Sequence, residues 1–517
     1  MPARLDPRNL AAISRLPKGQ VASRLFFFDE QPPAHAFNVH PVYAPVQKIP
    51  VTVEGPSAED RAVATFASSI VALEGGGYRL YGTSVRRGGN PRGEVRVWES
   101  GDGLDWQMLR LRDEAPINRL EITGVPGDAS FMVQPQVVPL RDGRWRLYLW
   151  KHRDGHLRYT VAESDDGLAW HVPDFERPAL YHPHDGGLWR WAEGLAQEAA
   201  TETAILSPEQ IAQHKRLSSN DATYVYYNDL LDRYECYSVW LHPAVPDRRV
   251  EEDNAPGVHR LLQRRVSDDG LEWGHGELVL MPDGRSDRGD PWDLQFYFMA
   301  MQWHHDWMIG SIGHYRVEAG QQSQDLALCF SRDGRTWQRP VRGGLIPRTG
   351  ADTPEGWAPG GRPPERDADV PQDAGGIYAP NVWLDHDGDW LILYSATPDA
   401  HNRNRGLSRP MGALVSHNRL VGLAAGRTRG GFMTEPFILQ APQITLDAEV
   451  RGWLRAELCD AFGRKLPGHH LDDSEPLQGD RVDHVLRWRD QATDAHRHEC
   501  LRVRFEFVEG EVYGLGY

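Results

Sequence analysis

Short apolar runs with period two, each ended by a turn rich in Gly, Asp or Asn, recur along most of this chain. Clear examples are residues 70–73, 78–82, 145–150 and 390–394. Runs of this length and period are typical of β-strands, and turn residues at such close spacing connect neighbouring strands as antiparallel hairpins. The pattern therefore predicts an all-β protein made of many short strands.

Four of these strand groups end in the same phrase, Ser-x-Asp-Gly-x-x-Trp. It occupies residues 100–106, 164–170, 267–273 and 331–337. Gly accepts a positive φ, the Asp side chain can bond backbone amides two residues on, and the Trp supplies a large apolar surface. Repetition at this scale is typical of small sheets arranged radially, so the sequence predicts a β-propeller. A fifth strand group, near 377–415, lacks the phrase but has the same strand pattern, which gives five blades.

The rest of the chain divides around this repeat. Residues 1–65 are predicted to be an N-terminal lead-in, with a short helix near 10–13 and a strand that packs on the propeller, and residues 66–427 form the five-bladed propeller. Residues 428–517 have longer period-two strands and are predicted to form a C-terminal β-sandwich. Two segments interrupt the blades: an insertion with a helix within 171–218, and a non-periodic loop at 348–372.

Composition narrows the functional classes. The formal charge of −16 argues against a nucleic-acid or anionic-membrane partner, and no apolar run approaches the roughly 20 residues that a membrane helix needs. No secretory signal is visible, so a cytoplasmic location is expected. The four cysteines have no metal-type spacing and are expected to be free thiols. The 18 Trp and 17 Tyr suit propeller cores and also sugar sites, where rings stack on the C–H faces of the sugar.

Candidate catalytic groups follow from the propeller geometry. The innermost strand of each blade lines the central channel, so polar residues at the starts of these strands converge near the axis. Asp221, Asp293 and Asp373 hold such positions in blades three, four and five. Glycoside hydrolysis needs carboxyl groups of this kind, one to protonate the leaving oxygen and another to act as nucleophile or base. We predict that Asp221 and Asp293 form this pair and that Asp373 orients the substrate or stabilises positive charge. For each, the alternative is a turn or cap residue.

Other polar and aromatic residues at the same strand starts are predicted to bind the sugar. These are Gln134, Gln136, Trp292, Tyr378 and Asn381. The Asp residues of the repeated phrase are predicted to be structural. His304, His305 and His401 lack the spacing of a metal site, so we predict hydrogen-bonding or solvent-facing histidines there, and neither a metal nor a cofactor.

Two motifs resemble known enzymes. The phrase at 331–337 is similar to the blade endings of glycoside hydrolase families 32, 43 and 68, and residues 377–382 resemble a first strand of family 43. The chain resembles more closely a group of family-32-like bacterial proteins, through Asp221, the segment 293–297, Asp373 and the tail around 452–458 and 471–474. The resemblance implies a five-bladed propeller with three acids in an axial funnel. The Asn-Asp-Pro-Asn-Gly motif of invertases is absent from blade one, and Asp290-Pro291 resembles their Asp-Pro but lies in another blade.

The sequence thus predicts a glycoside hydrolase that cleaves an oligo- or polysaccharide in the axial funnel of the propeller. A non-catalytic carbohydrate-binding propeller is the alternative, since a fold does not fix a function. A lyase or phosphorylase is a third possibility. A phosphorylase would need a basic pocket near the acids, where Arg288 is the basic residue closest in sequence.

Overall fold

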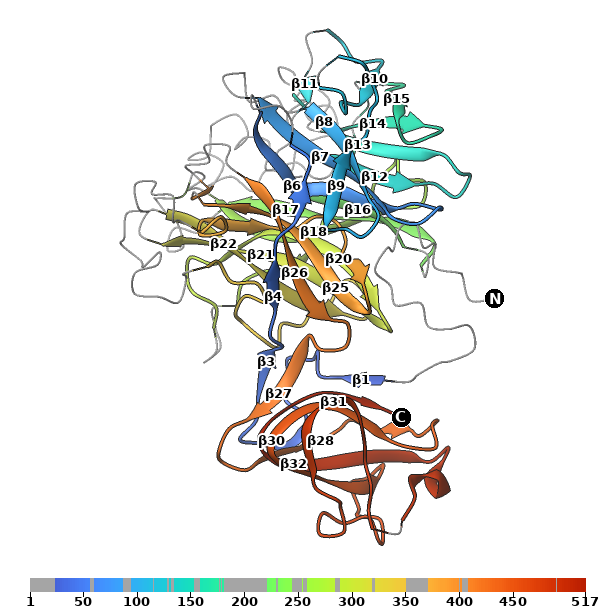
Figure 1. Ribbon diagram of the computed structural model, residues 1–517, viewed down its shortest axis with the longest axis vertical. Coiled ribbons are helices and arrows are strands. Elements are labelled where there is room, and N and C mark those ends of the chain that lie inside the picture. Colours follow the sequence, from blue (N-terminus) through green and yellow to red (C-terminus); the bar gives the residue numbers. More distant parts are fainter. Residues whose placement is uncertain are drawn as a thin grey trace. The chain divides into compact units, whose positions relative to one another are not determined.

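The computed structural model describes two compact units of the chain (Figure 1). Among the described residues, unit 1 contains 47–337 and 343–414, and unit 2 contains 24–46, 338–342 and 415–517. The described residues are 24–517 without 56–59, 87–93, 115, 128–129, 132–133, 153–158, 176, 178, 181–220, 229–230, 244–252, 254–257, 284–288, 319–320, 350–370, 399, 402–407 and 490. Both helices that the sequence predicts, near 10–13 and within 171–218, fall on residues outside this set.

Hydrogen bonding joins the strands of unit 1 into four sheets. The first has the order β5 (Thr52–Val53), β9 (Asp105–Met108), β8 (Glu94–Ser100), β7 (Tyr78–Arg86), β6 (Asp60–Ala72). The second has the order β10 (Glu121–Thr123), β15 (Ala169–His171), β14 (Tyr159–Ser164), β13 (Trp145–His152), β11 (Ser130–Phe131), and β12 (Gln136–Pro139) also pairs with β13. The third is an antiparallel meander of β16 (Asp221–Asn228), β17 (Arg233–Pro243), β18 (Val258–Ser267) and β19 (Glu277–Leu280).

The fourth sheet has eight strands and contains two of the predicted blades. Its order is β20 (Gln295–His304), β21 (Trp307–Glu318), β22 (Gln321–Ser331), β23 (Gly376–Tyr378), β25 (Asp389–Thr397), β26 (Arg409–Ser416), β4 (Gln47–Ile49), and β24 (Leu384–His386) also pairs with β25. The two halves join through a single parallel pair, Gln324 with Gly376. The structure therefore has four hydrogen-bonded sheets in unit 1 where the sequence predicts five separate blades.

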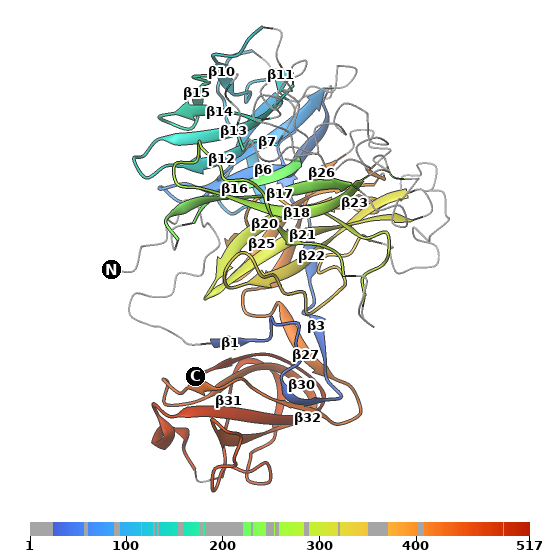
Figure 2. The same cartoon turned by 180° about the vertical axis from the view of Figure 1, so that it is seen from behind.

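The sheets of unit 1 contact one another in chain order. β6 contacts β12, β12 contacts β16, β16 contacts β20, and β25 of the last sheet contacts β6 of the first. Figure 2 shows β16, β17 and β18 next to the strands of the fourth sheet. These contacts close a circuit through the four sheets. The prediction of an all-β protein is confirmed for the described residues, whose helical structure is limited to 3₁₀ turns such as η3 (Thr493–His496) in unit 2.

The repeated phrase forms the same turn four times. In each copy the Ser Oγ accepts the Gly N–H, at 2.8–2.9 Å, and the Asp Oδ1 accepts two backbone N–H groups further on, at 2.7–3.1 Å. Each Gly has a φ between 71° and 81°, which a residue with a Cβ adopts only with strain. The Trp folds back to donate its indole N–H to the Gly carbonyl, at 2.7–3.2 Å. The predicted structural role of the four Asp residues agrees with these bonds.

Three of these turns also link one sheet to the next. A buried tyrosine in the sheet before each turn donates its hydroxyl to the same Gly carbonyl. The three bonds are Tyr81 to Gly167 at 2.8 Å, Tyr148 to Gly270 at 2.6 Å and Tyr237 to Gly334 at 3.4 Å. Because these tyrosines hold equivalent positions in β7, β13 and β17, the same hydrogen bond joins the repeated phrase to the preceding sheet each time. The repeat is thus a connection between sheets as well as a turn.

Unit 2 is one nine-stranded sheet organised around its last strand, β32 (Cys500–Gly516). Its other strands are β1 (Arg24–Phe26), β2 (Ala34–Phe37), β3 (His40–Tyr43), β27 (Val421–Ala425), β28 (Gly430–Met433), β29 (Phe437–Ile438), β30 (Thr445–Asp460) and β31 (Leu477–Val485). β1 pairs with β32, β2 with β28 and β3 with β27. The sequence assigned these first strands to a lead-in that packs on the propeller. In the structure their backbone partners lie in unit 2: β1 pairs with the long strand β32, and β2 and β3 pair with the short strands β28 and β27.

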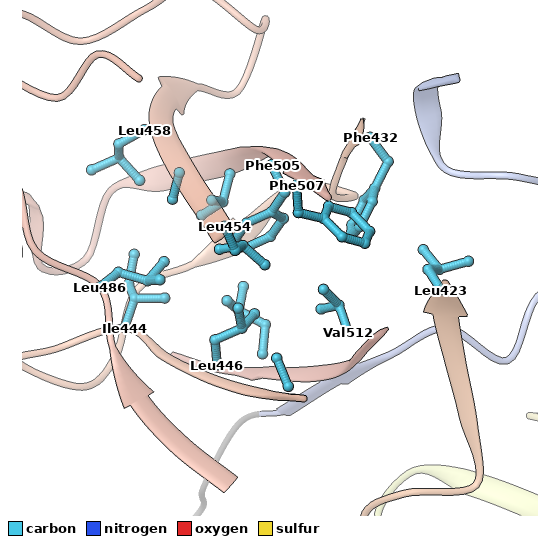
Figure 3. Packing of buried hydrophobic residues seen from close by; sticks show 14 of the residues in the cluster. Leu423, Phe432, Ile444, Leu446, Leu454, Leu458, Leu486, Phe505, Phe507 and Val512 are labelled. Carbon is cyan, nitrogen blue, oxygen red and sulfur yellow. The ribbon is translucent and has the colours of Figure 1, made fainter. Parts of the chain in front are cut away.

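The core of unit 2 is a single apolar cluster (Figure 3). Leu446, Leu454, Phe505 and Phe507 from β30 and β32 meet Phe432 of β28, and all five are buried. Alternate residues along β32 point into this core, as expected for a sheet with one covered face. All four cysteines are free, as predicted, and three of them are buried. Among the described residues, no helix has the length and apolar character to span a membrane.

Candidate functional site

Two of the three predicted catalytic acids have buried side chains that are paired with a cation. Asp293, just before β20, accepts Arg316 Nε at 2.8 Å and the backbone N–H of Val317 at 3.0 Å, and Arg316 Nη2 lies 2.8 Å from its other oxygen. Asp373, just before β23, lies 2.6 Å from Lys48 Nζ. Each is therefore an acceptor held in place by a basic side chain at the start of a strand.

The third predicted acid, Asp221, is the first residue of β16. Its backbone pairs with Val239, and the register shifts between Asp221 and Tyr224. Ala222, which follows it, is buried and has a φ of 44°, an uncommon conformation for Ala. The side chain of Asp221 lies outside the described set, so its predicted role stays a prediction.

The residues predicted to bind sugar are placed differently from one another. Gln134 is buried with a φ of 99° and accepts the hydroxyl of Tyr159 at 3.0 Å. A non-Gly residue with this backbone conformation is strained, and such strain often occurs at functional positions. Gln136 is buried and its amide Nε2 donates to the carbonyl of Pro135 at 3.0 Å. Trp292 is 60% exposed, in contrast to Asp293 beside it, which is 2% exposed.

Asn381 has a structural task in this arrangement. Its Oδ1 accepts the N–H of Ile70 in β6 at 2.8 Å, and its Nδ2 donates to the Ile70 carbonyl at 3.4 Å. Tyr226 of β16 donates its hydroxyl to the Asn381 carbonyl at 3.1 Å, and Tyr224 donates to the carbonyl of Ala379. The segment after β23 thus ties the first, third and last strand groups together.

The structure brings together a second group of residues that the sequence does not single out, centred on the carboxylate of Asp253. Arg260, in β18, donates to both oxygens of Asp253, at 2.8 and 3.1 Å. Gln295, in β20, donates to one of these oxygens at 2.7 Å and accepts from Arg260 at 2.8 Å. Tyr315, in β21, donates its hydroxyl to the other oxygen at 3.3 Å. All four residues are buried.

Aromatic rings extend this group toward β23. Tyr297 stacks on Tyr315 with centroids 5.5 Å apart, and its ring edge meets Tyr378 at 6.4 Å. The half-buried ring of His401 lies 4.9 Å from Tyr297 and 5.7 Å from Tyr315. Its Nδ1 is 2.8 Å from the hydroxyl of Tyr378. We call the whole group the tyrosine–histidine cluster; its members are Asp253, Arg260, Gln295, Tyr297, Tyr315, Tyr378 and His401.

Burial and charge set the protonation of this cluster. Burial alone would lower the pKa of Arg260, but Tyr315 and Asp253 outweigh that effect and the pKa is raised, so the guanidinium stays charged. The Arg260 guanidinium also lies over the rings of Tyr315, at 4.5 Å, and Tyr297, at 5.6 Å. Burial raises the pKa of Tyr378, with a smaller opposing effect from Arg260 and Arg348. Tyr378 therefore keeps its proton throughout the neutral pH range.

Buried carboxylate, guanidinium, amide and phenol groups beside stacked rings can recognise a sugar, whose hydroxyls need fixed donors and acceptors and whose C–H face packs on rings. Within the described residues, no group of three or more His, Cys, Asp or Glu side chains has a geometry that could hold a metal ion. Acid–base and charge-stabilising chemistry is what these side chains can supply.

The sequence points to part of this site. Tyr378 and the acids at strand starts could be predicted from where each strand begins in the periodic pattern. Asp253 lies between two non-periodic segments, and His401 follows a strand end without a motif, so neither could be predicted in this way. Arg260 gave no specific signal for Asp253, because its strand, β18, also contains the buried arginines Arg264 and Arg265.

No family model matches this chain, and no curated protein matches it in sequence. Solved structures with a similar arrangement include a protein named glycoside hydrolase, which is 12% identical, covers 75% of this chain and 92% of its own, and has a TM-score of 0.45. An N-acetylgalactosamine deacetylase from F. plautii, solved with blood group B trisaccharide, is 17% identical, with 72% and 96% covered and a TM-score of 0.45. A family 117 glycoside hydrolase from Zobellia galactanivorans is 12% identical, with 72% and 90% covered and a TM-score of 0.38. Similarities of this size do not assign a function to the chain.

Proposed function

We propose that unit 1 is a five-bladed propeller that hydrolyses a glycosidic bond at the end where β16, β18, β20 and β23 begin. The circuit of contacts from β6 through β12, β16 and β20 to β25 supports the propeller, with the eight-stranded sheet supplying two blades. The observation that carries the function is the tyrosine–histidine cluster, in which a buried carboxylate, its guanidinium partner, three tyrosines and His401 converge from four strands and two connecting segments.

The carboxylates of this end suit the charged roles in glycoside cleavage. Asp253, Asp293 and Asp373 each lie within hydrogen-bond distance of a cation: Arg260, Arg316 and Lys48. Protonating Asp253 would leave the buried guanidinium of Arg260 without its counter-charge, which costs several kcal/mol. Arg316 and Lys48 are half-buried, so water can reach these two cations. An acid paired with a cation in this way is suited to act as a nucleophile, as a base for water, or as a stabiliser of the positive charge that develops at the anomeric carbon.

The same ion pairs also favour a second candidate, a propeller that binds carbohydrate without cleaving it. An acid whose oxygens are already occupied by Arg or Lys is a good hydrogen-bond acceptor for a sugar hydroxyl and a weaker nucleophile. The exposed ring of Trp292, beside buried Asp293, fits either function. Turnover distinguishes the two.

The test is a panel of 4-nitrophenyl glycosides and unmodified oligosaccharides, with release of nitrophenol or reducing ends as the readout. The variants are Asp253→Asn, Asp293→Asn and Asp373→Asn, which keep the shape of each side chain. Asp165→Asn, in an exposed turn position of the repeated phrase, is the matched control. For a catalytic carboxylate we expect kcat to fall by about 10²–10⁴-fold, with the control unchanged.

Two outcomes would reject hydrolysis. One is full activity in all three variants. The other is a wild-type protein that binds a sugar saturably in calorimetry but turns over no member of the panel, which would establish the binding propeller in its place. A protein that neither binds nor cleaves any glycan in the panel would reject both candidates.

A further inference from the structure

The three ion-paired carboxylates leave one role of the proposed reaction without a residue, that of the proton donor to the leaving oxygen. A donor must hold a proton near the working pH and release it in the transition state. Among the members of the tyrosine–histidine cluster, His401 is the side chain whose ordinary pKa, about 6.5, lies near neutrality. It is also half-buried, whereas the other members of the cluster are buried. His401 is thus the member of the cluster that a bound ligand can reach most readily.

The surroundings of His401 fix the orientation of its ring. The rings of Tyr297 and Tyr315 both pack against the imidazole in an edge-to-face arrangement, with interplanar angles of 68° and 88°. The hydroxyl of Tyr378 lies 2.8 Å from Nδ1. Nδ1 thus faces a phenol that does not ionise in the neutral range, and Nε2 lies on the opposite side of the imidazole ring from that hydroxyl.

We propose that His401 is the general acid of the site and that Tyr378 positions it; this inference rests on the proposed glycosidase function. The imidazolium Nε2–H gives its proton to the glycosidic oxygen as the bond from that oxygen to the anomeric carbon breaks, and the sugar leaves as an alcohol. Water then adds its oxygen to the anomeric carbon and loses one proton to a carboxylate. That carboxylate releases the proton to solvent, and the imidazole takes one up again, so the net reaction consumes one water.

The groups that face His401 determine how activity depends on pH. Among the described residues they include Tyr297 from β20, Tyr315 from β21 and Tyr378 from β23, with Arg260 of β18 stacked over the first two. Arg260 is compensated by Asp253 at 2.8 Å, so its charge does not act alone on the imidazole. Because the acid must be protonated, kcat/KM falls as pH rises through the pKa of His401.

The experiment compares leaving groups, because a proton donor matters most when the leaving oxygen is basic. His401→Gln is assayed on an unmodified oligosaccharide and on the 2,4-dinitrophenyl glycoside of the same sugar, as chosen from the panel. We expect about a 10²–10³-fold loss of kcat/KM on the oligosaccharide, little loss on the dinitrophenyl substrate, and disappearance of the basic limb of the pH profile. Tyr378→Phe should shift that limb without abolishing it. His386→Gln, half-buried in β24, is the matched control and should resemble wild type.

The outcomes separate this inference from the proposed function. Equal losses on both substrates, or an unchanged basic limb in His401→Gln, would overturn the role of His401 while the activity of the wild type still stands. If the wild type cleaves neither substrate, the glycosidase function fails and the inference fails with it. As a measurement that needs no substrate, NMR titration of ¹³C-labelled histidines should show the pKa of His401 changing in Tyr378→Phe. An unchanged value would overturn the positioning role.

Discussion

The tyrosine bonds between sheets give a quantitative prediction, which we develop for Tyr148→Phe. This substitution removes only the hydroxyl that donates to the Gly270 carbonyl at 2.6 Å, inside a fully buried contact. The carbonyl still accepts the indole N–H of Trp273 at 3.2 Å, so no buried acceptor is left without a donor. Arg146 also bonds this hydroxyl, but it keeps its bonds to the Asp269 carbonyl and to Glu163. The main loss is therefore the hydrogen bond to Gly270, about 1 kcal/mol of the free energy of unfolding.

The assay is equilibrium urea unfolding followed by tryptophan fluorescence. With an m-value of roughly 3 kcal/mol/M for a unit of this size, the unfolding midpoint should fall by about 0.3 M. The matched control is Tyr78→Phe, whose hydroxyl bonds the Asp385 carbonyl at 3.2 Å on a half-buried ring, where water can replace it. We expect the control to change the free energy by less than about 0.5 kcal/mol. Equal midpoints for the two variants would refute the view that these hydroxyls hold the sheets together.

Three further predictions concern other parts of the chain. Against the opposing effect of burial, backbone N–H donors lower the pKa of the four repeated-phrase acids Asp102, Asp166, Asp269 and Asp333. Their stabilising contribution is complete above the unfolded pKa of about 3.9 and is lost as the pH falls through the folded pKa values. The urea concentration at the unfolding midpoint should therefore decrease as the pH is lowered below about 4, and it should decrease less in a variant with Asn at all four positions. Gly376→Ala would place a Cβ 3.0–3.3 Å from the ring of Tyr378 and should lower kcat/KM, measured on the substrate found with the panel, whereas Gly343→Ala, with nothing within 4 Å, should not. Asp447→Ala removes the buried partner of Arg24, at 2.7 Å, and of Arg419, at 2.6 Å, and should destabilise unit 2 by about 3–5 kcal/mol in thermal unfolding; an unchanged melting temperature would contradict this.

Local patterns in the sequence predicted the elements that local chemistry determines. The phrase Ser-x-Asp-Gly-x-x-Trp specifies its own turn, because the Ser, Asp and Gly make their bonds within the phrase. The second bond of the Gly carbonyl was beyond such reasoning, since its donor, such as Tyr148 for Gly270, is 122 residues away. The pairing of Gln324 with Gly376, which merges two predicted blades into one sheet, is equally long-range.

The candidate site was predictable where it follows the phase of the strands and not where it depends on irregular segments. Asp293 and Asp373 lie at strand starts, as the pattern indicated, but their cations Arg316 and Lys48 come from the end of one strand and from a strand far away in the chain. Asn381 had the expected position for a sugar ligand, yet its amide bonds Ile70 across 311 residues. Periodicity reports which face a residue occupies, and it carries no information about which partner meets it there.

The pairing of β1, β2 and β3 with strands that lie beyond residue 420 has a consequence for how the protein is made. These three strands leave the ribosome long before β27, β28 and β32 are synthesised, so their backbone hydrogen bonds can form only near the end of translation. During that time they are exposed strand edges that can pair with another chain. Unit 2 is therefore completed late in biosynthesis. The yield of folded protein should depend on the speed of elongation and on chaperones that cover the unpaired N-terminal strands.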